Sequence, residues 1–386
     1  MKIPVYSKLS MNKYHVGICV SLILHFSSCI NKATSDINEN INEHQIEISS
    51  DLNFFDDSKS FICDTSFVIL HENEKTLFSD IMKMIAVDDR FYILDRFRAR
   101  TVVAFDRHGN PICCYGAVGQ GAGEYSFPSD LYVDETGVYV ADCPRKKIIK
   151  YSLAGEYIEE RSVPFGFGFF CKLPNENYLF NITPDGNTKD GLILTDSDFQ
   201  IKKVVVKYPD EFYGGYYTRN VIRKINDQQY IYYTSPLDTI YQLNQDGEVK
   251  EKLVLDFKGS SVSDEYKKNF LRIAGNKSDY IMFADSPIEI QEGFWVGNTL
   301  SPGIIGTVFL DLHNNRSGLK RLPKDEGSVY DLPYMIGYSD KGETINLLDS
   351  EYETKQDFDL LPDSIQDAIK GGERVLILNK WNFSGN

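Results

Sequence analysis

Short apolar runs separated by turn residues make up most of the chain, and two neighbouring stretches repeat the same pattern. Positions 85–112 and 131–158 each begin with an apolar strand, a turn and a second strand that ends in Asp. A third strand then meets a fourth through a turn that contains Gly109 or Gly155, 46 positions apart. A unit of about this length is what a four-stranded propeller blade needs.

Weaker copies of the pattern follow in step along the chain. They fall at 177–196, 229–249, 292–311 and 334–379. At this period the chain from about residue 60 onward accommodates six blades better than seven. The strand at 67–70 precedes the first full repeat, and we expect it to complete the last blade, because ring closure removes exposed strand edges. The sequence therefore predicts an all-β, six-bladed propeller with four-stranded blades, closed by an N-terminal strand paired with C-terminal strands.

Three local features depart from plain strand patterning. Segments 263–273 and 363–369 have helical patterns and are expected as insertions between strands, the second with Asp363 as its N-cap. Asp95 and Asp142 end equivalent strands in the two clear repeats. Because short acidic side chains often accept backbone N–H groups in turns, this recurrence indicates a structural role rather than a catalytic pair.

Composition and charge narrow the possible functions. Aromatic residues make up 13% of the chain, which favours strands over helices, and mean hydropathy is -0.31. The net charge is -15, and this argues against a nucleic-acid partner, since affinity for phosphate backbones comes from basic surfaces. The short basic run at 145–147 is interpreted as a solvated turn between strands.

The N-terminus has the layout of an export signal. A Lys-containing start precedes an apolar run at 16–24, which is too short to span a bilayer as a helix. The sequence at 26–29, Phe-Ser-Ser-Cys, resembles a lipobox with Phe in place of the commoner Leu. We expect residues 1–28 to be removed, with Cys29 as the lipid attachment site and the membrane as a partner through that lipid. An ordinary signal with an incidental Cys29 is the alternative, and Met11 is an alternative start to Met1.

The residues after the signal divide into a tether and a domain. Residues 29–55 are rich in Asn, Glu and Ser and are expected to form a flexible polar tether. Residues 56–386 are assigned to the propeller. The first positions after Cys29 lack the acidic cluster that resembles a surface-export signal in lipoproteins of Bacteroidetes. The expected location is therefore the cell envelope, at a periplasm-facing outer membrane.

Five cysteines lie outside the signal and the lipid site: Cys63, Cys113, Cys114, Cys143 and Cys171. Their disulfide pairing stays open, although the adjacent Cys113 and Cys114 would point to opposite faces of a strand. Most of the five are interpreted as small buried hydrophobic residues. No Cys-x-x-Cys pair and no metal-ligand spacing of histidines occurs, so no metal site or cofactor is predicted. A divalent cation held by converging carboxylates in the central channel stays an open alternative.

The glycine-rich segment at 119–125 carries a family resemblance. It reads Gly119-Gln120-Gly121-Ala122-Gly123-Glu124-Tyr125. This is similar to the Gly-x-Gly-Pro-Gly-Glu-Tyr motif of six-bladed β-propeller lipoproteins of Bacteroidetes, which are related in pattern to NHL-repeat propellers. Ala122 stands where that family usually has proline. The resemblance spans essentially the whole mature chain and implies the propeller fold, but it implies no particular activity.

The same segment does not fit a phosphate-binding loop. A dinucleotide fingerprint needs Gly-x-Gly-x-x-Gly at the start of a helix, and a P-loop needs Gly-Lys-Ser/Thr. Here the glycines lead into Glu124-Tyr125 and a strand. We interpret Gly119, Gly121, Gly123, Glu124 and Tyr125 as a structural crossover loop between blades.

Aromatic clusters between predicted blades are the candidate ligand-binding loops. They contain Phe167, Phe169, Tyr213, Tyr216 and Tyr217. Exposed aromatic rings suit sugars or peptides, whereas the alternative is that these rings pack between adjacent blades. Arg219, with Arg223 nearby, could hold an anionic ligand or serve as a surface charge.

Three functions remain open at this point. The first is a non-enzymatic envelope module that binds a glycan, peptide or protein partner through one propeller face. The second is a metal-dependent hydrolase or lyase resembling lactonase-type or NHL-type six-bladed enzymes. The third is a scaffold subunit of an envelope complex. No catalytic residue is predicted, and whether the protein is an enzyme stays open, with the balance toward no.

Overall fold

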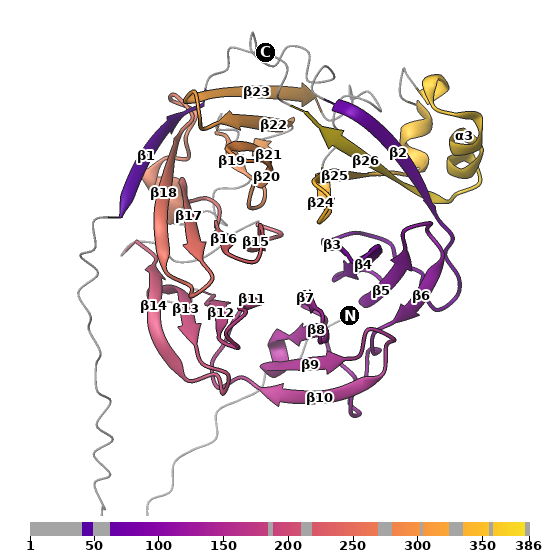
Figure 1. Cartoon of the computed structure of the whole chain (residues 1–386), viewed down its shortest axis with the longest axis horizontal. Helices are drawn as coiled ribbons and strands as arrows, with labels where there is room; N and C mark the ends of the chain where they lie inside the picture. The colour runs from indigo at the N-terminus through magenta and orange to yellow at the C-terminus, as the bar shows by residue number, and fades with distance from the viewer. Residues whose placement is uncertain are drawn as a thin grey trace, which may run out of the picture. The chain divides into compact units, whose positions relative to one another are not determined.

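Six β-sheets stand in a ring around a central axis (Figure 1). The computed structural model describes residues 41–48, 62–183, 188–209, 218–268, 280–301, 304–323, 335–354 and 358–382. Within each sheet the blade strands are antiparallel, and the first strand of each blade lies innermost. The predicted six-bladed propeller is confirmed.

The first three blades each contain four strands in chain order. Blade 1 comprises β3 (Lys83–Val87), β4 (Arg90–Asp95), β5 (Thr101–Asp106) and β6 (Pro111–Cys114). Blade 2 comprises β7 (Asp130–Asp134), β8 (Gly137–Asp142), β9 (Lys147–Tyr151) and β10 (Tyr157–Ser162). Blade 3 comprises β11 (Phe169–Lys172), β12 (Tyr178–Asn181), β13 (Asp190–Thr195) and β14 (Ile201–Lys207).

The last three blades depart from this plan. Blade 4 comprises β15 (Ile222–Lys224), β16 (Gln229–Tyr232), β17 (Thr239–Asn244), β18 (Val249–Asp256) and an added β1 (Asn42–Glu47). Blade 5 has a split inner strand, with β19 (Met282–Phe283), β20 (Ile288–Gln291), β21 (Phe294–Ser301), β22 (Ile304–Asp311) and β23 (Arg316–Pro323). Blade 6 comprises β24 (Met335–Tyr338), β25 (Glu343–Leu348), β26 (Arg374–Trp381) and the N-terminal β2 (Ile62–Leu70).

Ring closure occurs in blade 6, as predicted. Strand β2 pairs antiparallel with β26 from Ile62 opposite Trp381 to Leu70 opposite Arg374. Leu70 is buried beside residues of blade 1, so the closing strand also carries apolar contacts to the next blade. The first and last parts of the propeller sequence are thereby joined in one sheet.

The expectation of a flexible tether at 29–55 is wrong for the part of this segment that forms β1. This strand pairs in parallel with the outer strand of blade 4, with Asn42 opposite Glu251 and Glu47 opposite Asp256. Ile46 and Ile48 are buried in the core that blade 4 shares with blade 5. The strand covers an outer edge that would otherwise present unpaired backbone groups, and its apolar residues were too few to stand out in a polar tract. Residues 29–40 and 49–55 lie outside the described chain.

The repeated glycines occupy tight turns between the third and fourth strands. Gly109 has φ +82° and Gly155 has φ +91°, so the predicted positive φ is confirmed. A Cβ at Gly109 would lie 1.8 Å from the carbonyl oxygen of Ile69, in the last strand of the preceding blade. At Gly155 it would lie 3.1 Å from the carbonyl oxygen of Cys114, also in the preceding blade. Each glycine therefore lets neighbouring blades approach closely.

The repeated aspartates are buried and hold the loops that enter each blade. Asp95 accepts hydrogen bonds from the backbone N–H groups of Ser79 and Asp80, and Asp142 accepts from the backbone N–H and hydroxyl of Ser126. Burial alone would raise the pKa of Asp95, but its backbone donors outweigh burial and leave the pKa below its ordinary value. The predicted structural role of these two residues is confirmed.

The two helical insertions are present in shortened or shifted form. Helix α1 (Asp264–Lys268) is the described part of the first. Helix α3 (Asp363–Lys370) is the second, and it packs on blade 6 through buried Ile365 and Ile369. Asp363 is not the N-cap as expected. Pro362 takes that position, and Asp363 instead places its charge in the first turn.

The hydrophobic core lies mainly between neighbouring blades. One cluster joins blades 1 and 2 through Leu94, Val102, Leu131 and Val140, all fully buried. The cysteines at 63, 113, 114, 143 and 171 are free thiols. Only Cys171 is fully buried, and Cys63 is exposed, so the interpretation of most as buried hydrophobic residues is confirmed only in part.

Candidate functional site

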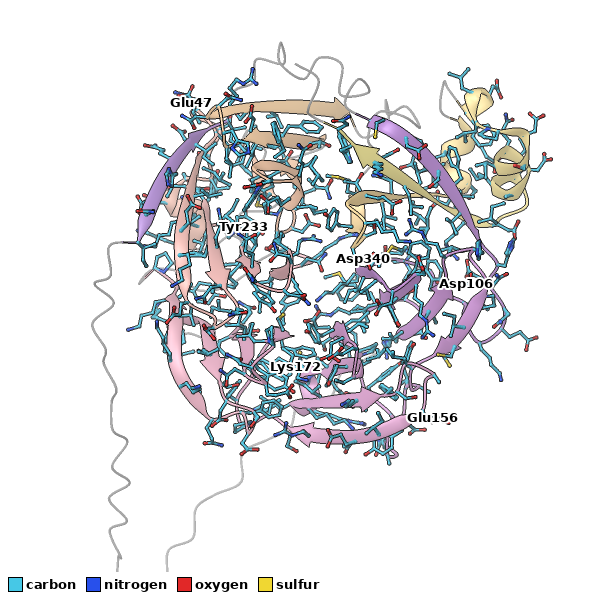
Figure 2. The ribbon with its side chains drawn as sticks, viewed as in Figure 1. Glu47, Asp106, Glu156, Lys172, Tyr233 and Asp340 are labelled. Carbon is cyan, nitrogen blue, oxygen red and sulfur yellow. The ribbon has the colours of Figure 1, made fainter. Side chains whose placement is uncertain are left out.

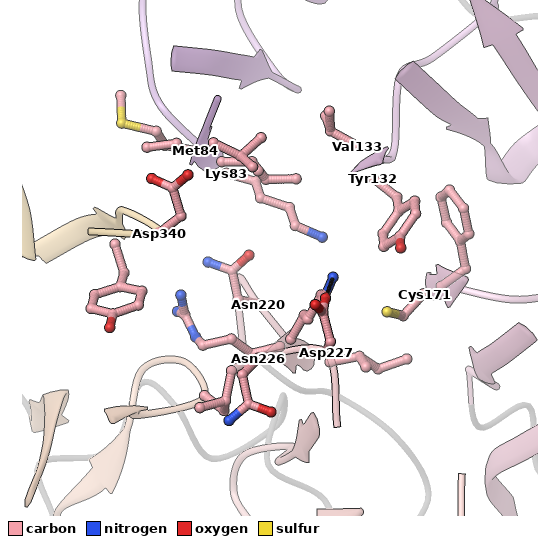
Figure 3. Close-up of a pocket in the computed structure, with 18 residues that line it drawn as sticks. Lys83, Met84, Tyr132, Val133, Cys171, Asn220, Asn226, Asp227 and Asp340 are labelled. Atoms are coloured by element: carbon pink, nitrogen blue, oxygen red, sulfur yellow. Dashed lines mark ion pairs between the residues drawn. The ribbon is translucent and has the colours of Figure 1, made fainter. Parts of the chain in front are cut away.

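A cavity of about 370 Å³ lies on the propeller axis (Figure 3). We call it the channel pocket. Its lining comes from the innermost strands of five blades, β3, β7, β11, β15 and β24, together with the turns that follow β15 and β24. Its size is at the lower end of the range typical of small-molecule sites. In Figure 2, Asp340 lies near the axis, whereas Glu47, Asp106 and Glu156 lie at the outer rim of the ring.

A buried charge pair links three blades at the wall of the pocket. The ammonium of Lys83 in β3 lies 2.8 Å from Oδ1 of Asp130 in β7. The other carboxylate oxygen of Asp130 accepts the backbone N–H of Phe170 in β11 at 3.0 Å. Because both charges are buried and paired, they fix the inner strands relative to one another.

Cys171 also lines this wall (Figure 3). Burial raises the pKa of its thiol to about 12, in spite of the opposing effect of Lys83 and Lys224. At neutral pH the thiol is therefore protonated and is a weak nucleophile. Its contribution to the pocket is a small apolar surface rather than covalent chemistry.

Arg223 supplies a second cation to the wall. Its Nε donates to the carbonyl oxygen of Ser286 at 3.2 Å, and one Nη lies 4.0 Å from a carboxylate oxygen of Asp285. Burial raises the pKa of Asp285 to about 6, while Arg223 and Arg219 act in the opposite direction. The guanidinium of Arg223 is thus held in place from the blade 5 side.

The end of the channel opposite the pocket mouth is crossed by Arg219. Its guanidinium donates to the carbonyl oxygen of Ile81, just before β3, at 3.1 Å. Strands β15 and β3 stand on opposite sides of the ring, so this side chain spans the axis (Figure 1). The segment between β19 and β20 reinforces this end, since the Ser286 backbone N–H and hydroxyl donate to the carbonyl oxygens of Asn220 and Val221 at 3.0 Å.

The mouth of the pocket carries charges of both signs. Lys224 pairs with Asp227 at 2.7 Å, and both side chains are exposed to solvent. Asp340, from the turn after β24, accepts the backbone N–H of Asp88 at 3.2 Å. Asn226 and Tyr338 complete this rim. The arrangement provides hydrogen-bond donors, acceptors, both charges and an aromatic ring around one opening, which suits a polar ligand.

The comparison with known families identifies the group to which this chain is related. The model of a family described as a domain of unknown function, DUF4934, matches residues 33–295. The chain belongs to the DUF4934 family. The family description attaches no activity to its members, so function must be argued from the site.

One of the similar solved structures supports the same fold. A Bacteroides fragilis protein that is named as exported superposes with a TM-score of 0.71 at 20% identity, covering 88% of this chain and 100% of that one. A member of the DUF4221 family from Bacteroides vulgatus has a TM-score of 0.49 at 11% identity, covering 83% and 97%. Virginiamycin B lyase from Staphylococcus aureus has a TM-score of 0.40 at 13% identity, covering 68% and 75%. At 20% identity the likeness to the Bacteroides fragilis protein shows the fold alone.

The aromatic candidates fall into two groups in this DUF4934 protein. Phe167 and Phe169 are each only 4% exposed, and their rings belong to the core around Phe180 and Phe170. Of the two interpretations left open, the packing of these rings between adjacent blades is therefore confirmed for Phe167 and Phe169, and they offer no exposed ring to a ligand. Tyr213, Tyr216 and Tyr217 lie outside the described residues.

The two candidate arginines lie at the channel. Arg223 lines the pocket wall, and Arg219 reaches across the channel to the carbonyl oxygen of Ile81, away from the mouth. No ligand is needed to explain the position of Arg219, because a backbone carbonyl on the opposite side of the ring accepts its hydrogen bond.

The glycine-rich segment is the crossover from blade 1 to blade 2, as interpreted. The Glu124 side chain accepts the N–H of Gly121 at 2.7 Å, and the Gly119 N–H donates to the carbonyl oxygen of Tyr125 at 3.0 Å. Gly123 has φ +72°, and its carbonyl oxygen accepts the Tyr151 hydroxyl. These internal bonds occupy the loop's own donors, and the ring of Tyr125 is fully buried.

The expected signal and lipid site fall on residues that the structure does not describe. The signal at 1–28 and Cys29 lie outside it. In the ranges that the structure describes, no helix is long and apolar enough to cross a bilayer. Nor do the described side chains include a group of three or more His, Cys, Asp or Glu residues able to hold a metal ion.

Sequence reasoning missed most of the pocket residues. Lys83, Asn220 with Asp227, and Asp340 come from three distant parts of the chain, and nothing in their spacing brings these parts together. One signal was available. Lys83 opens an otherwise apolar innermost strand, and the inner strands of a propeller face the channel, so a charge there points to the axis.

Proposed function

We propose that the protein is an exported module of the cell envelope, acylated at Cys29, that binds the polar end of a glycan or peptide in the channel pocket. The observation that carries this proposal is the convergence of charged, amide and aromatic side chains from five blades on one open cavity. Such a cavity, with a few polar groups on an apolar wall, is the usual form of a ligand site.

Charge placement indicates what the ligand carries. Lys83 and Arg223 lie on the wall, and Lys224, Asp227 and Asp340 lie at the mouth. A ligand with an anionic group entering first and hydroxyl or amino groups remaining at the mouth would match both sets. Peptide ends and acidic sugars have these groups, whereas a purely apolar molecule would cover the polar side chains of the mouth without giving them hydrogen bonds.

Other observations support the proposed location and anchoring. The N-terminal signal pattern and the likeness to a Bacteroides protein that is named as exported favour export. Acylation at Cys29, a periplasm-facing position and the relation to NHL-repeat propellers stay predictions. Mass spectrometry of the mature chain would test acylation, since a diacylglyceryl adduct on a chain beginning at Cys29 is expected, and a free N-terminal segment before Cys29 would contradict it.

A ligand screen tests the binding function. The chain is heated with a panel of glycans and short peptides, and the best ligand is titrated by calorimetry. Replacing Lys224 with Gln or Asp340 with Asn should weaken binding about tenfold each, because a hydrogen bond to a charged group contributes roughly 1.5–3 kcal/mol. Lys202→Gln, on exposed outer strand β14, is the matched control and should leave affinity unchanged.

Other results would point away from a pocket ligand. Equal affinity in the pocket and control variants would contradict the proposed site. Stabilisation by calcium or zinc together with substrate turnover would support the hydrolase or lyase alternative. A defined protein complex in the absence of any ligand shift would support the scaffold alternative.

A further inference from the structure

Three arginines stand within five positions on the loop between β4 and β5. They are Arg96, Arg98 and Arg100 in the sequence Arg-Phe-Arg-Ala-Arg. Positions 97–100 are exposed, and Phe97 retains 57% of its surface in contact with solvent. An exposed aromatic ring between cations is unusual for a chain with a net charge of -15.

The equivalent loop of blade 2 adds two more cations. Arg145 and Lys146 lie between β8 and β9, with Lys146 exposed. Lys147 differs from them, because it is buried and pairs with Glu160 at 2.7 Å. The run at 145–147 is therefore not simply a solvated turn, since its members have separate surroundings.

Contacts through Phe127 and Asp142 link the two loops. The guanidinium of Arg96 lies 5.2 Å from the ring centre of Phe97 and 5.3 Å from that of Phe127. Ser126, which precedes Phe127, donates a hydrogen bond to the carboxylate of Asp142, and Arg145 lies 3.8 Å from the same carboxylate. We call Arg96, Arg98, Arg100, Arg145 and Lys146 the basic surface.

A second apolar side chain stands beside this surface. Leu77 is 57% exposed, as Phe97 is. The buried carboxylate of Asp95 holds both segments, since it accepts the N–H groups of Ser79 and Asp80 from one and of Arg98 from the other. Leu77 and Phe97 are thus apolar tips on loops fixed by the same residue.

The nearby acidic groups leave most of these cations outward-facing, although Asp142 pairs with Arg145 at 3.8 Å. Asp95 and Asp142 are fully buried and bonded to backbone N–H groups. The carboxylate of Asp80 accepts the N–H of Ile81 and is partly buried. Outward-facing charge on these two loops is therefore mainly positive.

The basic surface and the pocket mouth lie at opposite ends of the blades. The basic loops follow the second strands, β4 and β8, whereas the mouth includes the ends of the first strands and the turns after them. In an antiparallel sheet, consecutive turns lie at opposite ends of the strands. A surface held by the basic loops would leave the pocket mouth facing away from it.

We propose that the basic surface binds the anionic headgroups of a phospholipid bilayer, with Phe97 and Leu77 entering the interface. Cations attract an anionic leaflet, and aromatic and aliphatic tips among them add apolar contact at the boundary. Acidic polymers match the charge but not the two exposed apolar tips, which favours the bilayer. This inference does not rest on the pocket ligand or on acylation.

Vesicle sedimentation tests the inference with the full chain. Each preparation is mixed with neutral phosphatidylcholine vesicles and with vesicles containing about one third phosphatidylglycerol. The readout is the ratio of binding to the two, so that contributions from the N-terminal segment common to both cancel. We expect the ratio to exceed about ten at low salt and to fall as salt screens the charges.

Matched variants locate the effect. The double change Arg98→Gln and Arg100→Gln should lower the ratio about tenfold, and Phe97→Ser should lower binding to anionic vesicles severalfold. Ile201→Ser with Lys202→Gln removes an exposed apolar side chain and a cation from β14 and should change nothing. Unaltered melting temperatures would show that each variant is folded.

Two results would overturn the inference. One is an equal ratio in the basic-surface variants and the β14 control. The other is binding to soluble polygalacturonate that depends on Arg98 and Arg100, with no preference between the two kinds of vesicle, since this would assign the surface to an acidic polymer.

Discussion

Blades 1 and 2 keep the four-stranded plan of the repeat, whereas blades 4 and 5 depart from it. In the first pair, equivalent glycines and aspartates occupy equivalent turns and loops. In the second pair, an added strand covers β18, and the inner strand of blade 5 is split around residues 284–287. Ser286 of that segment donates to the carbonyl oxygens of Asn220 and Val221, just before β15.

This difference distinguishes the residues that hold neighbouring blades together from the residues that form the candidate site. Repeated residues hold neighbouring blades together, so they recur wherever two blades meet. Irregular residues, such as Arg219, Asp285 and Asp227, occupy the axis, where a ring of identical blades would place identical side chains. A polar pocket with charges of both signs therefore requires departures from the repeat.

The largest effect should come from removing a buried repeat aspartate. Asp142→Ala leaves the N–H and hydroxyl of Ser126 without their acceptor and should cost about 3 kcal/mol, or about 4 °C in melting temperature. Asp196→Ala removes a partly exposed carboxylate that also accepts two turn N–H groups and should cost less than about 1 kcal/mol. Equal losses of stability in the two variants would show that the buried repeat aspartate contributes no more than an ordinary turn residue.

A repeat glycine should be the next most sensitive position. Gly109→Ala places a Cβ against the backbone of Ile69 at a positive φ and should lower the melting temperature by about 3 °C. Gly259→Ala is the control, because it has φ +72° but nothing within 4 Å of its Cβ, and about 1 °C is expected. Matching values would mean that backbone conformation alone, not blade contact, explains the repeat glycine.

The smallest effect should come from Asp285 at the irregular end of the channel. Its folded-state pKa of about 6 exceeds the unfolded value of 3.8, so its contribution to stability is present at low pH and is lost as pH rises through about 6. Asp285→Asn lacks this dependence. The melting temperature of the variant relative to wild type should rise by about 2 °C from pH 5 to pH 7.5. If the difference in melting temperature does not change with pH, burial does not raise the pKa of Asp285 in the folded protein.

The fold could be predicted because its determinants are local and repeated. Strand patterns, Gly109 with Gly155, and the closing strand at 67–70 were all legible in the sequence. Strand β1 could not be, since a polar segment forms a strand there only when the edge of β18 is available. The same holds for the pocket, whose residues meet only after the ring closes. Whether the phenylalanines at 167 and 169 are exposed or buried could not be predicted either, because burial depends on the direction of each ring, which composition does not specify.

A crystal structure of the protein with the best ligand from the screen would test the central claim most directly. We expect ligand density between β3 and β15, in contact with Lys224 or Asp340 at the mouth and directed toward Arg223 on the wall. Density on an outer strand or on the blade crossovers, with the channel pocket unchanged, would contradict the assignment of the site to the irregular part of the ring.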